Sequence, residues 1–163
     1  MKNVNVKKLV ISLSILILFF LLDRISKNLI LNILEETGKV DIYINSFLSF
    51  YLVWNKGIGF GLLSSEQDYF YNIVTALIVL INFVIIYLLL KEKGMKYYFL
   101  LFILGGSLGN LFDRIYFRAV PDFIDLNYNG YHWFIFNVAD IFITIGIILL
   151  ILAEFLSYKK TNE

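Results

Sequence analysis

The chain has 163 residues, 60% of them hydrophobic, a formal net charge of +1 and a mean hydropathy of +0.78. Soluble domains are about half apolar, so this excess indicates a membrane protein, which we expect to form a single domain over residues 1–163. The lack of Cys excludes a disulfide framework and a thiolate nucleophile, and the single His132 excludes a histidine metal cluster or Ser-His machinery within one chain. We expect no metal and no cofactor.

Four segments are apolar over about 20 residues, the length that a helix needs to cross a bilayer. They predict a mainly α-helical membrane protein whose two long loops are 32–68 and 118–133. The predicted spans are about 9–31, 69–90, 97–117 and 134–156. The first span follows Lys7 and Lys8 as in a signal peptide, but no small-residue cleavage site follows it, so we expect a retained helix.

Lysines mark one side of the four predicted spans. They lie before the first span, between the second and third, and after the fourth, whereas both long loops carry a group of acids. Because basic residues are enriched in cytoplasmic segments, both termini are predicted in the cytoplasm and both loops outside. The lysines are Lys2, Lys7, Lys8, Lys91, Lys93, Lys96, Lys159 and Lys160, and the loop acids are Glu35, Glu36, Asp41, Glu66, Asp68, Asp122 and Asp125.

Three spans place acids or amides in the same outer layer of the membrane. At 1.5 Å per helical residue, Asp23 lies roughly 22 Å beyond Lys8, and Asp140 lies roughly 9 Å below Phe134. An ionisable residue inside a span is costly and is by default a functional hypothesis. The residues of this layer are Asp23, Asn110, Asp113 and Asp140.

The alternative for these residues is purely structural, a set of ion pairs near the interface. The candidate pairs are Asp23 with Arg24 or Lys27, and Asp113 with Arg114. Asp140 has no basic neighbour in the sequence, so the structural alternative is weaker there than for the other two acids.

The outer loops have the composition of strands. Residues 40–55 are mostly β-branched, aromatic or aliphatic, and Asn129-Gly130 is a strong signal for a two-residue hairpin. If these two residues form the turn, Tyr128 pairs with Tyr131. We therefore expect a small β-rich region, with a hairpin, over the outer ends of the helices.

The same turn brings two acids toward one place. Counting back along both strands puts Asp122 opposite Asn137, and Asp140 lies three residues further on the same helical face. A slip of one residue in the register would reverse the facing.

Two carboxylates in a low-dielectric pocket do not both ionise easily, so one keeps its proton near neutral pH. One acid then activates water and the other protonates a leaving amine, which is the chemistry of aspartic proteases.

A Ser26 nucleophile with a Lys27 base has poor geometry, because the two are adjacent on a helix. Two further classes stay open: a small proton- or ion-coupled transporter subunit, and a non-catalytic assembly or lipid-binding protein that would not require both acids.

Glycine-rich segments have two interpretations. The segment "NKGIGFG", 55–61, is either a structural turn or a place of close backbone approach to a ligand. The segment "GGSLG", 105–109, has the GxxxG spacing typical of helix packing. His132, between aromatic residues, is predicted to be an interfacial or packed side chain.

Five boxes in chain order resemble those of the lipoprotein signal peptidases, the signal peptidase II family. They cover nearly the whole chain, and together they are far more specific than any one of them. The boxes are "DRISK" at 23–27, "NKGIGFG" at 55–61, "GGSLGNLFDR" at 105–114, "PDFID" at 121–125 and "FNVAD" at 136–140.

The resemblance implies a membrane aspartic endopeptidase of the bacterial cytoplasmic membrane. Such an enzyme removes the signal peptide of diacylglyceryl-modified prolipoproteins by cutting just before the lipidated Cys, and it is the target of globomycin. Membrane lipids are further expected partners. The resemblance also implies a catalytic pair, Asp122 and Asp140, with Asp125 outside it. The implied supporting or substrate-binding residues are Asp23, Lys27, Asn55, Gly57, Asn110, Asp113, Arg114 and Asn137.

Three positions depart from the family pattern. Pro121 stands where an aliphatic residue is usual, Ile141 where Ser is common, and Gly59 where Ala is common. None of them removes an acid. Because Pro cannot donate to a strand ladder, Pro121 puts the local geometry of Asp122 in question.

Overall fold

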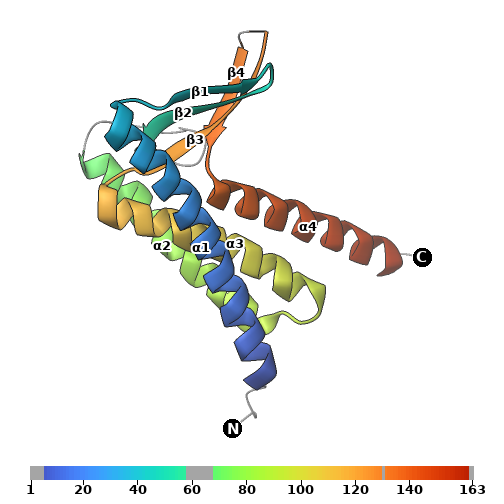
Figure 1. Cartoon of the computed structure of the whole chain (residues 1–163). Helices are drawn as coiled ribbons and strands as arrows, with labels where there is room; N and C mark the ends of the chain where they lie inside the picture. Colours follow the sequence, from blue (N-terminus) through green and yellow to red (C-terminus); the bar gives the residue numbers. More distant parts are fainter. Residues whose placement is uncertain (1–5, 58–67, 130, 162–163) are drawn as a thin grey trace.

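A computed structural model of the chain describes residues 6–57, 68–129 and 131–161. Four long helices run through it, and a small antiparallel sheet lies over one end of them (Figure 1). The elements in chain order are α1 Val6–Thr37, β1 Asp41–Asn45, β2 Leu48–Asn55, α2 Asp68–Lys91, α3 Met95–Phe117, β3 Val120–Tyr128, β4 Tyr131–Phe136 and α4 Val138–Thr161. We call the end where α1 ends, α4 begins and the sheet lies the sheet end, and the opposite end the far end.

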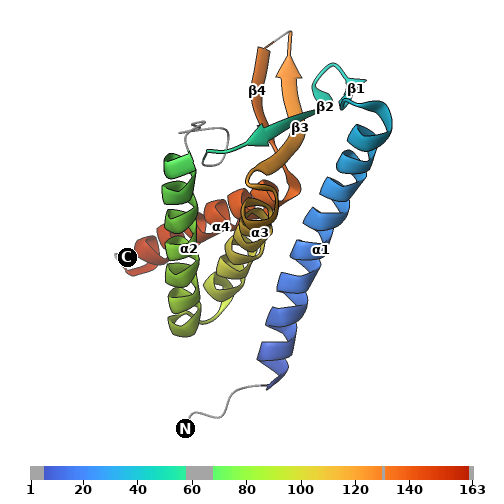
Figure 2. The same cartoon turned by 90° about the vertical axis from the view of Figure 1, so that its left-hand side faces the viewer.

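All four helices are long and apolar enough to cross a membrane, as predicted. The helix α3 is the least hydropathic and the most buried of the four. It lies between the others (Figure 2), and it packs against α1, α2 and α4. The most polar span is thus the one that lipid contacts least, which is how a bilayer-spanning bundle accommodates polar side chains.

The predicted fourth span begins four residues too early. Residues 131–136 form strand β4, and α4 starts only at Val138. Short apolar runs fit a strand as well as a helix, so periodicity alone did not separate Phe134 and Phe136 from the helix that follows. Asp140 consequently lies in the first turn of α4 rather than deeper along it.

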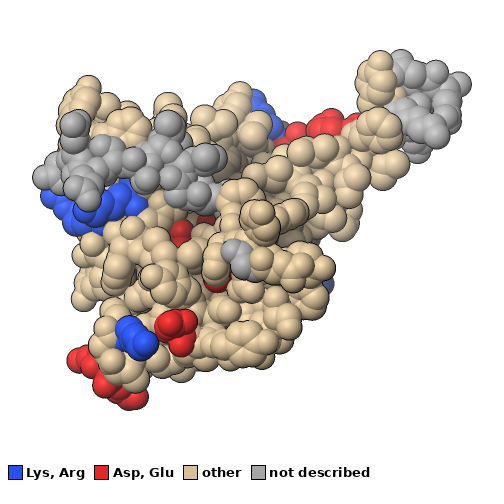
Figure 3. Space-filling view, turned by 90° about the horizontal axis from the view of Figure 1, so that it is seen from above, with Lys and Arg blue, Asp and Glu red and all other residues tan. Residues whose placement is uncertain are grey.

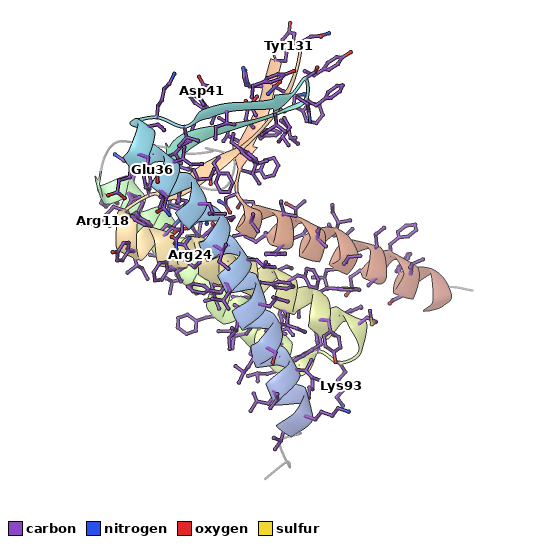
Figure 4. All side chains as sticks on the ribbon, in the orientation of Figure 1. Arg24, Glu36, Asp41, Lys93, Arg118 and Tyr131 are labelled. Carbon is purple, nitrogen blue, oxygen red and sulfur yellow. The ribbon has the colours of Figure 1, made fainter. Side chains whose placement is uncertain are left out.

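The sheet has the strand order β1-β2-β3-β4, and every neighbouring pair is antiparallel. The predicted hairpin is confirmed, since Tyr128 pairs with Tyr131 and Asn129 has a φ of 49°. A register shift between Asp125 and Asn127 separates this turn from the base of the hairpin. Tyr131 lies at the tip, which projects away from the helices (Figure 4).

Pro121 fits this sheet without breaking a ladder. It lies near the start of β3 and pairs with Trp54 of β2. On the other side of β3, the pairing with β4 reaches only as far as Ile124 and Phe136. Pro121 therefore lies where β3 has no second neighbour, which is where a strand tolerates proline.

Glycines and aromatic rings bring the helices together. A Cβ on Gly106 would collide with the carbonyl oxygen of Ala139 and with Ile143, so this glycine lets α3 and α4 approach closely. Further along, the ring of Phe19 stacks on Phe142 with centroids 4.2 Å apart. The prediction that "GGSLG" mediates helix packing is confirmed.

Candidate active site

Asn137 and Asp140 form a reciprocal cap at the start of α4. The backbone N–H of Asp140 donates to Oδ1 of Asn137 at 3.2 Å, and the backbone N–H of Asn137 donates to Oδ2 of Asp140 at 3.1 Å. This is the capping-box arrangement, in which the N-cap and the third helical residue satisfy each other's N–H groups. The spacing in "FNVAD" thus holds one carboxylate rigidly at a helix N-terminus, where the helix dipole favours negative charge.

Asn137 also joins this cap to Asp122. Its Nδ2 donates to Oδ1 of Asp122 at 2.6 Å, and Asn55 donates to Oδ2 of the same carboxylate at 2.8 Å. The predicted strand register, with Asp122 opposite Asn137, is wrong by one residue, because the register shifts between Asp125 and Asn127. The two side chains nevertheless meet through this hydrogen bond, beyond the end of β4. One asparagine therefore bridges Asp122 and Asp140.

Both carboxylates are almost inaccessible, with relative exposures of 2% for Asp122 and 8% for Asp140. Burial first, and the nearby Asp140 carboxylate second, raise the pKa of Asp122 from 3.8 to about 7. The two asparagine donors oppose this rise, because they favour the ionised form. Asp122 consequently exchanges its proton in the neutral range, as an acid–base group must do.

Behind the two acids lies a buried ionic cluster that joins α1 to α3. Lys27 lies 2.8 Å from Oδ1 of Asp23 and 2.6 Å from Oδ2 of Asp113, and all three side chains are at most 1% exposed. Arg24 reaches the same two acids from the edge, at 3.2 Å and 2.5 Å. Two acids and two bases balance, so the cluster is electrically neutral.

The cluster contacts the start of α4 in two places. Lys27 donates to Oδ1 of Asn110 at 2.9 Å, and Nδ2 of Asn110 donates to Oδ1 of Asp140 at 2.8 Å. Asp23 accepts the backbone N–H of Ala139 at 3.1 Å. The acids of α1 and α3 thus position α4 and do not lie in the pair itself.

Arg114 connects the segment around Gly57 to α3. Its Nη2 donates to the carbonyl oxygen of Gly57, and the Gly57 N–H is in turn held by Oδ1 of Asn55 at 2.8 Å. The Nε and Nη1 groups of Arg114 are buried and have no partner among the described residues. Ile58, Gly59, Phe60 and Gly61 of the glycine-rich box lie outside the described residues.

The structure corrects one predicted ion pair. Asp113 does not pair with Arg114 in the described part of the chain; it pairs with Lys27 and Arg24 of α1 instead. Adjacent residues on a helix point in different directions, so Arg114 faces Gly57 while Asp113 faces α1. The predicted pairs of Asp23 with Arg24 and Lys27 are confirmed.

Sequence reasoning missed two contacts around the site. Tyr71 of α2 donates to the backbone carbonyl of Arg114 at 2.6 Å, and no motif marks this tyrosine. His132, predicted to be interfacial or packed, is 64% exposed at its side chain, and its Nδ1 lies 2.7 Å from Oδ2 of the buried Asp125. Asp125 thus has its own partner, away from the Asn137 bridge.

A pocket of about 230 Å³ opens beside Asp140 and is lined by Phe136, Asp140, Ile141 and Thr144. Seen from the sheet end, the space-filling view shows acidic atoms in recesses of a largely uncharged surface (Figure 3). An apolar wall next to a carboxylate suits a substrate that is apolar on either side of a polar bond. Among the described residues, no three His, Cys, Asp or Glu side chains are grouped so that they could hold a metal ion.

The fold and the site define a multi-pass membrane protein with two bridged, buried carboxylates, the arrangement used for acid–base chemistry by aspartic peptidases. A family model described as signal peptidase (SPase) II matches residues 15–156. The chain therefore belongs to the signal peptidase II family of aspartic-type membrane hydrolases, and it is a bacterial multi-pass membrane protein that processes prolipoprotein signal peptides.

Individual relatives agree with this family. A lipoprotein signal peptidase of Pelagibacter ubique is 51% identical over 164 residues, which cover 100% of this chain and 99% of the relative. One from Aquifex aeolicus is 41% identical over 158 residues, covering 95% and 92%. A solved structure of a bacterial membrane enzyme superposes with a TM-score of 0.74 at 29% identity, covering 93% of this chain and 90% of the other.

Proposed function

We propose that the chain is an aspartic endopeptidase that cuts diacylglyceryl-modified prolipoproteins just before the lipidated Cys, with Asp122 and Asp140 as its catalytic pair. The observation that carries this proposal is the Asn137 bridge, which contacts Asp122 at 2.6 Å and Asp140 at 3.1 Å. Two buried carboxylates that are bridged by one residue and repel each other share a proton, which supplies a base and an acid at one pH.

The reaction needs only these two groups and water. The ionised carboxylate takes a proton from water as the water oxygen attacks the scissile carbonyl carbon. The protonated carboxyl group then gives its proton to the leaving amine, and the carbon–nitrogen bond breaks. The pKa of about 7 at Asp122 supports such an exchange near neutral pH.

The supporting residues fall into three groups: those that contact the two carboxylates, those that act through the buried ionic cluster, and one that is available to the substrate. Asn137, Asn55 and Asn110 donate directly to the carboxylates and hold them in place. Asp23, Lys27 and Asp113 act through the buried cluster. Arg114, whose buried Nε and Nη1 atoms have no partner among the described residues and whose Nη2 contacts Gly57, is the residue suited to bind the substrate backbone or the oxyanion of the intermediate.

The site lies where a lipidated substrate presents its bond. Asp140 is in the first turn of an apolar, membrane-spanning helix, and the pocket beside it has apolar walls formed by Phe136 and Ile141. The acyl chains of a diacylglyceryl Cys and the apolar signal peptide both remain in the bilayer, so the bond between them lies near an interface. We place this interface on the outer face of the cytoplasmic membrane, with both termini inside, and we expect contacts with membrane lipids and inhibition by globomycin-type peptides.

The first test is cleavage of a diacylglyceryl-modified prolipoprotein by the purified protein in detergent with a chelator present. Wild type is expected to cut before the lipidated Cys, and Asp122→Asn and Asp140→Asn are each expected to be folded and inactive. Asp125→Asn is the matched control, because Asp125 is equally buried on the same strand but pairs with His132. Full activity in either of the first two variants would remove that residue from the catalytic pair.

The topology has a separate test that uses the absence of cysteine. Lys93→Cys and Tyr131→Cys introduce single thiols at the far end and at the hairpin tip, where Figure 4 shows both residues. In intact cells, an impermeant maleimide is expected to label only the hairpin variant. Labelling of Lys93→Cys alone would invert the proposed orientation.

A further inference from the structure

The two carboxylates of the site receive different kinds of support. Asp122 lies on a strand and, among the described residues, accepts hydrogen bonds from the side-chain amides of Asn137 and Asn55. Asp140 lies in the first turn of α4, accepts a backbone N–H from Asn137, and accepts Nδ2 of Asn110. A helix N-terminus and a backbone donor both favour a negative charge, and Asp122 has neither.

Asn110 differs from Asn55 in what lies behind it. Its Oδ1 accepts a hydrogen bond from the buried ammonium group of Lys27 at 2.9 Å, whereas Oδ1 of Asn55 accepts the neutral N–H of Gly57 at 2.8 Å. An amide whose oxygen binds a cation is a stronger donor at its nitrogen, because successive hydrogen bonds polarise one another. The positive charge of Lys27 is therefore felt at Oδ1 of Asp140.

The other charges near the pair do not cancel this preference for a negative charge on Asp140. Asp23 and Asp113 are each neutralised by Lys27 and Arg24. Arg114 interacts electrostatically with both Asp122 and Asp140, so it does not strongly favour a negative charge on one of them over the other. The charged groups that act on Asp140 are Lys27 and Asp23 of α1, Arg114 of α3 and Asp122 of β3. Lys27 acts on Asp122 as well, but less than the two asparagine donors do.

Given the proposed function, we infer that the two acids are not interchangeable: Asp140 carries the negative charge and activates water, Asp122 keeps the shared proton, and Lys27, acting through Asn110, is the positioning residue that sets this order. In the cleavage reaction, water gives its proton to Asp140, and the leaving amine takes its proton from Asp122.

Two isosteric substitutions test this order, because each replaces an amide donor 2.8 Å from one member of the pair by a carboxyl group. With Asn110→Asp, an ionised Asp140 loses its donor and faces a second negative charge. The acid limb of the pH profile of kcat/KM should then move to higher pH, with a loss of at least about tenfold at pH 7, since one pH unit on a limb corresponds to tenfold. With Asn55→Asp, a neutral Asp122 donates a hydrogen bond to the new carboxylate and so keeps its proton to higher pH, and the acid limb should stay while the basic limb moves to higher pH.

A simple structural role for these asparagines would lower activity without moving either limb. The opposite pattern, in which Asn55→Asp moves the acid limb and Asn110→Asp the basic limb, would place the charge on Asp122 and overturn the inference. Equal profiles for the two variants would overturn it as well. If either aspartate variant fails to fold in a thermal melt, Asn110→Ala and Asn55→Ala replace it, with the acid limb expected to move only in the first.

The part of Lys27 is tested by conservative rescue. Lys27→Arg keeps the charge and is expected to keep the acid limb of the wild type, whereas Lys27→Met, measured on its folded fraction, should move that limb in the same direction as Asn110→Ala. An unmoved limb in Lys27→Met would remove Lys27 from the inference. These outcomes are distinct from failure of the proposed function, which would appear as cleavage by Asp122→Asn or Asp140→Asn.

Discussion

The helices α1, α3 and α4 meet in different ways at their two ends. At the sheet end, α1 and α3 are joined by four charged side chains, of which Asp23, Lys27 and Asp113 are at most 1% exposed. At the far end, the polar contacts among the described residues include a hydrogen bond of 2.7 Å between Ser12 and Tyr97 and a partly exposed pair of Lys96 and Glu154 at 2.7 Å. Figure 4 shows Arg24 near the first region and Lys93 at the second.

The comparison shows where this chain places costly interactions. Removing charges from water costs several kcal/mol per ion, and a buried pair recovers this only with good geometry and complete hydrogen bonding. Exposed pairs cost little and contribute little. The expensive cluster lies directly behind Asp140, so we attribute it to the positioning of the site and not to the stability of the bundle as such.

The largest expected effect comes from removing a charge at the sheet end. Lys27→Met leaves Asp23 and Asp113 with Arg24 alone, and breaking a buried pair in this way destabilises a protein by about 3–5 kcal/mol. Lys96→Met is the matched control at the far end, with an expected cost of about 0–1 kcal/mol. Denaturant unfolding of both variants in the same detergent compares them, and equal costs would remove the distinction between the two ends.

The second effect concerns pH. The pKa of Asp122 is about 7 in the folded chain and 3.8 ordinarily, so the folded state binds this proton more tightly. The stability that follows is fully present below about pH 4 and is lost as the pH rises through about 7. Up to about 4 kcal/mol is involved at 1.36 kcal/mol per pKa unit.

The measurement is the melting temperature of Asp122→Asn and wild type from pH 4 to pH 8. Asp122→Asn cannot ionise at this position, so its melting temperature relative to wild type should rise from pH 4 to about pH 7 and then level off. Asp41→Asn, at an exposed acid of β1, is the control and should run parallel to wild type. A constant difference between Asp122→Asn and wild type would contradict the raised pKa.

The third effect separates packing near the site from packing away from it. Gly106→Ala would place a Cβ against Ala139 at the start of α4, and Gly146→Ala would place one against Ile103 and Phe99 further along. Overpacking of this kind costs about 1–3 kcal/mol, and we expect this for both variants. Only Gly106→Ala should also lower kcat of the folded enzyme, because it displaces the turn that holds Asp140; equal kcat values would show that the site tolerates the displacement.

The smallest effect is expected at the edge of the sheet. His132→Gln removes the 2.7 Å contact to Asp125, but the histidine side chain is 64% exposed. Pairs with an exposed partner contribute about 0–1 kcal/mol, and we expect a loss of that order with unchanged cleavage. A melting experiment and the cleavage assay check this, and a loss as large as that of Lys27→Met would mean that burial of one partner suffices to make a pair strong.

Much of the architecture followed from the sequence alone. The four apolar segments were long enough to predict four helices, because a segment that crosses a bilayer must satisfy its own backbone hydrogen bonds. The Asn129-Gly130 sequence predicted that Tyr128 faces Tyr131, and these two residues do pair. The three-residue spacing of Asn137 and Asp140 predicted that the two residues lie close together, but their capping box was not predicted, because the helix was expected to begin at Phe134.

The tertiary structure decided the rest. The start of α4 at Val138, the register shift after Asp125 and the pairing of Asp113 with α1 could not be predicted, because each depends on which surface packs against which. The same holds for the contact of Asn110 with both Lys27 and Asp140, which joins three segments far apart in the chain. Local patterns specify helices, turns and caps through short-range hydrogen bonds, whereas the partners of a buried charge are chosen only when the helices meet and water is excluded from between them.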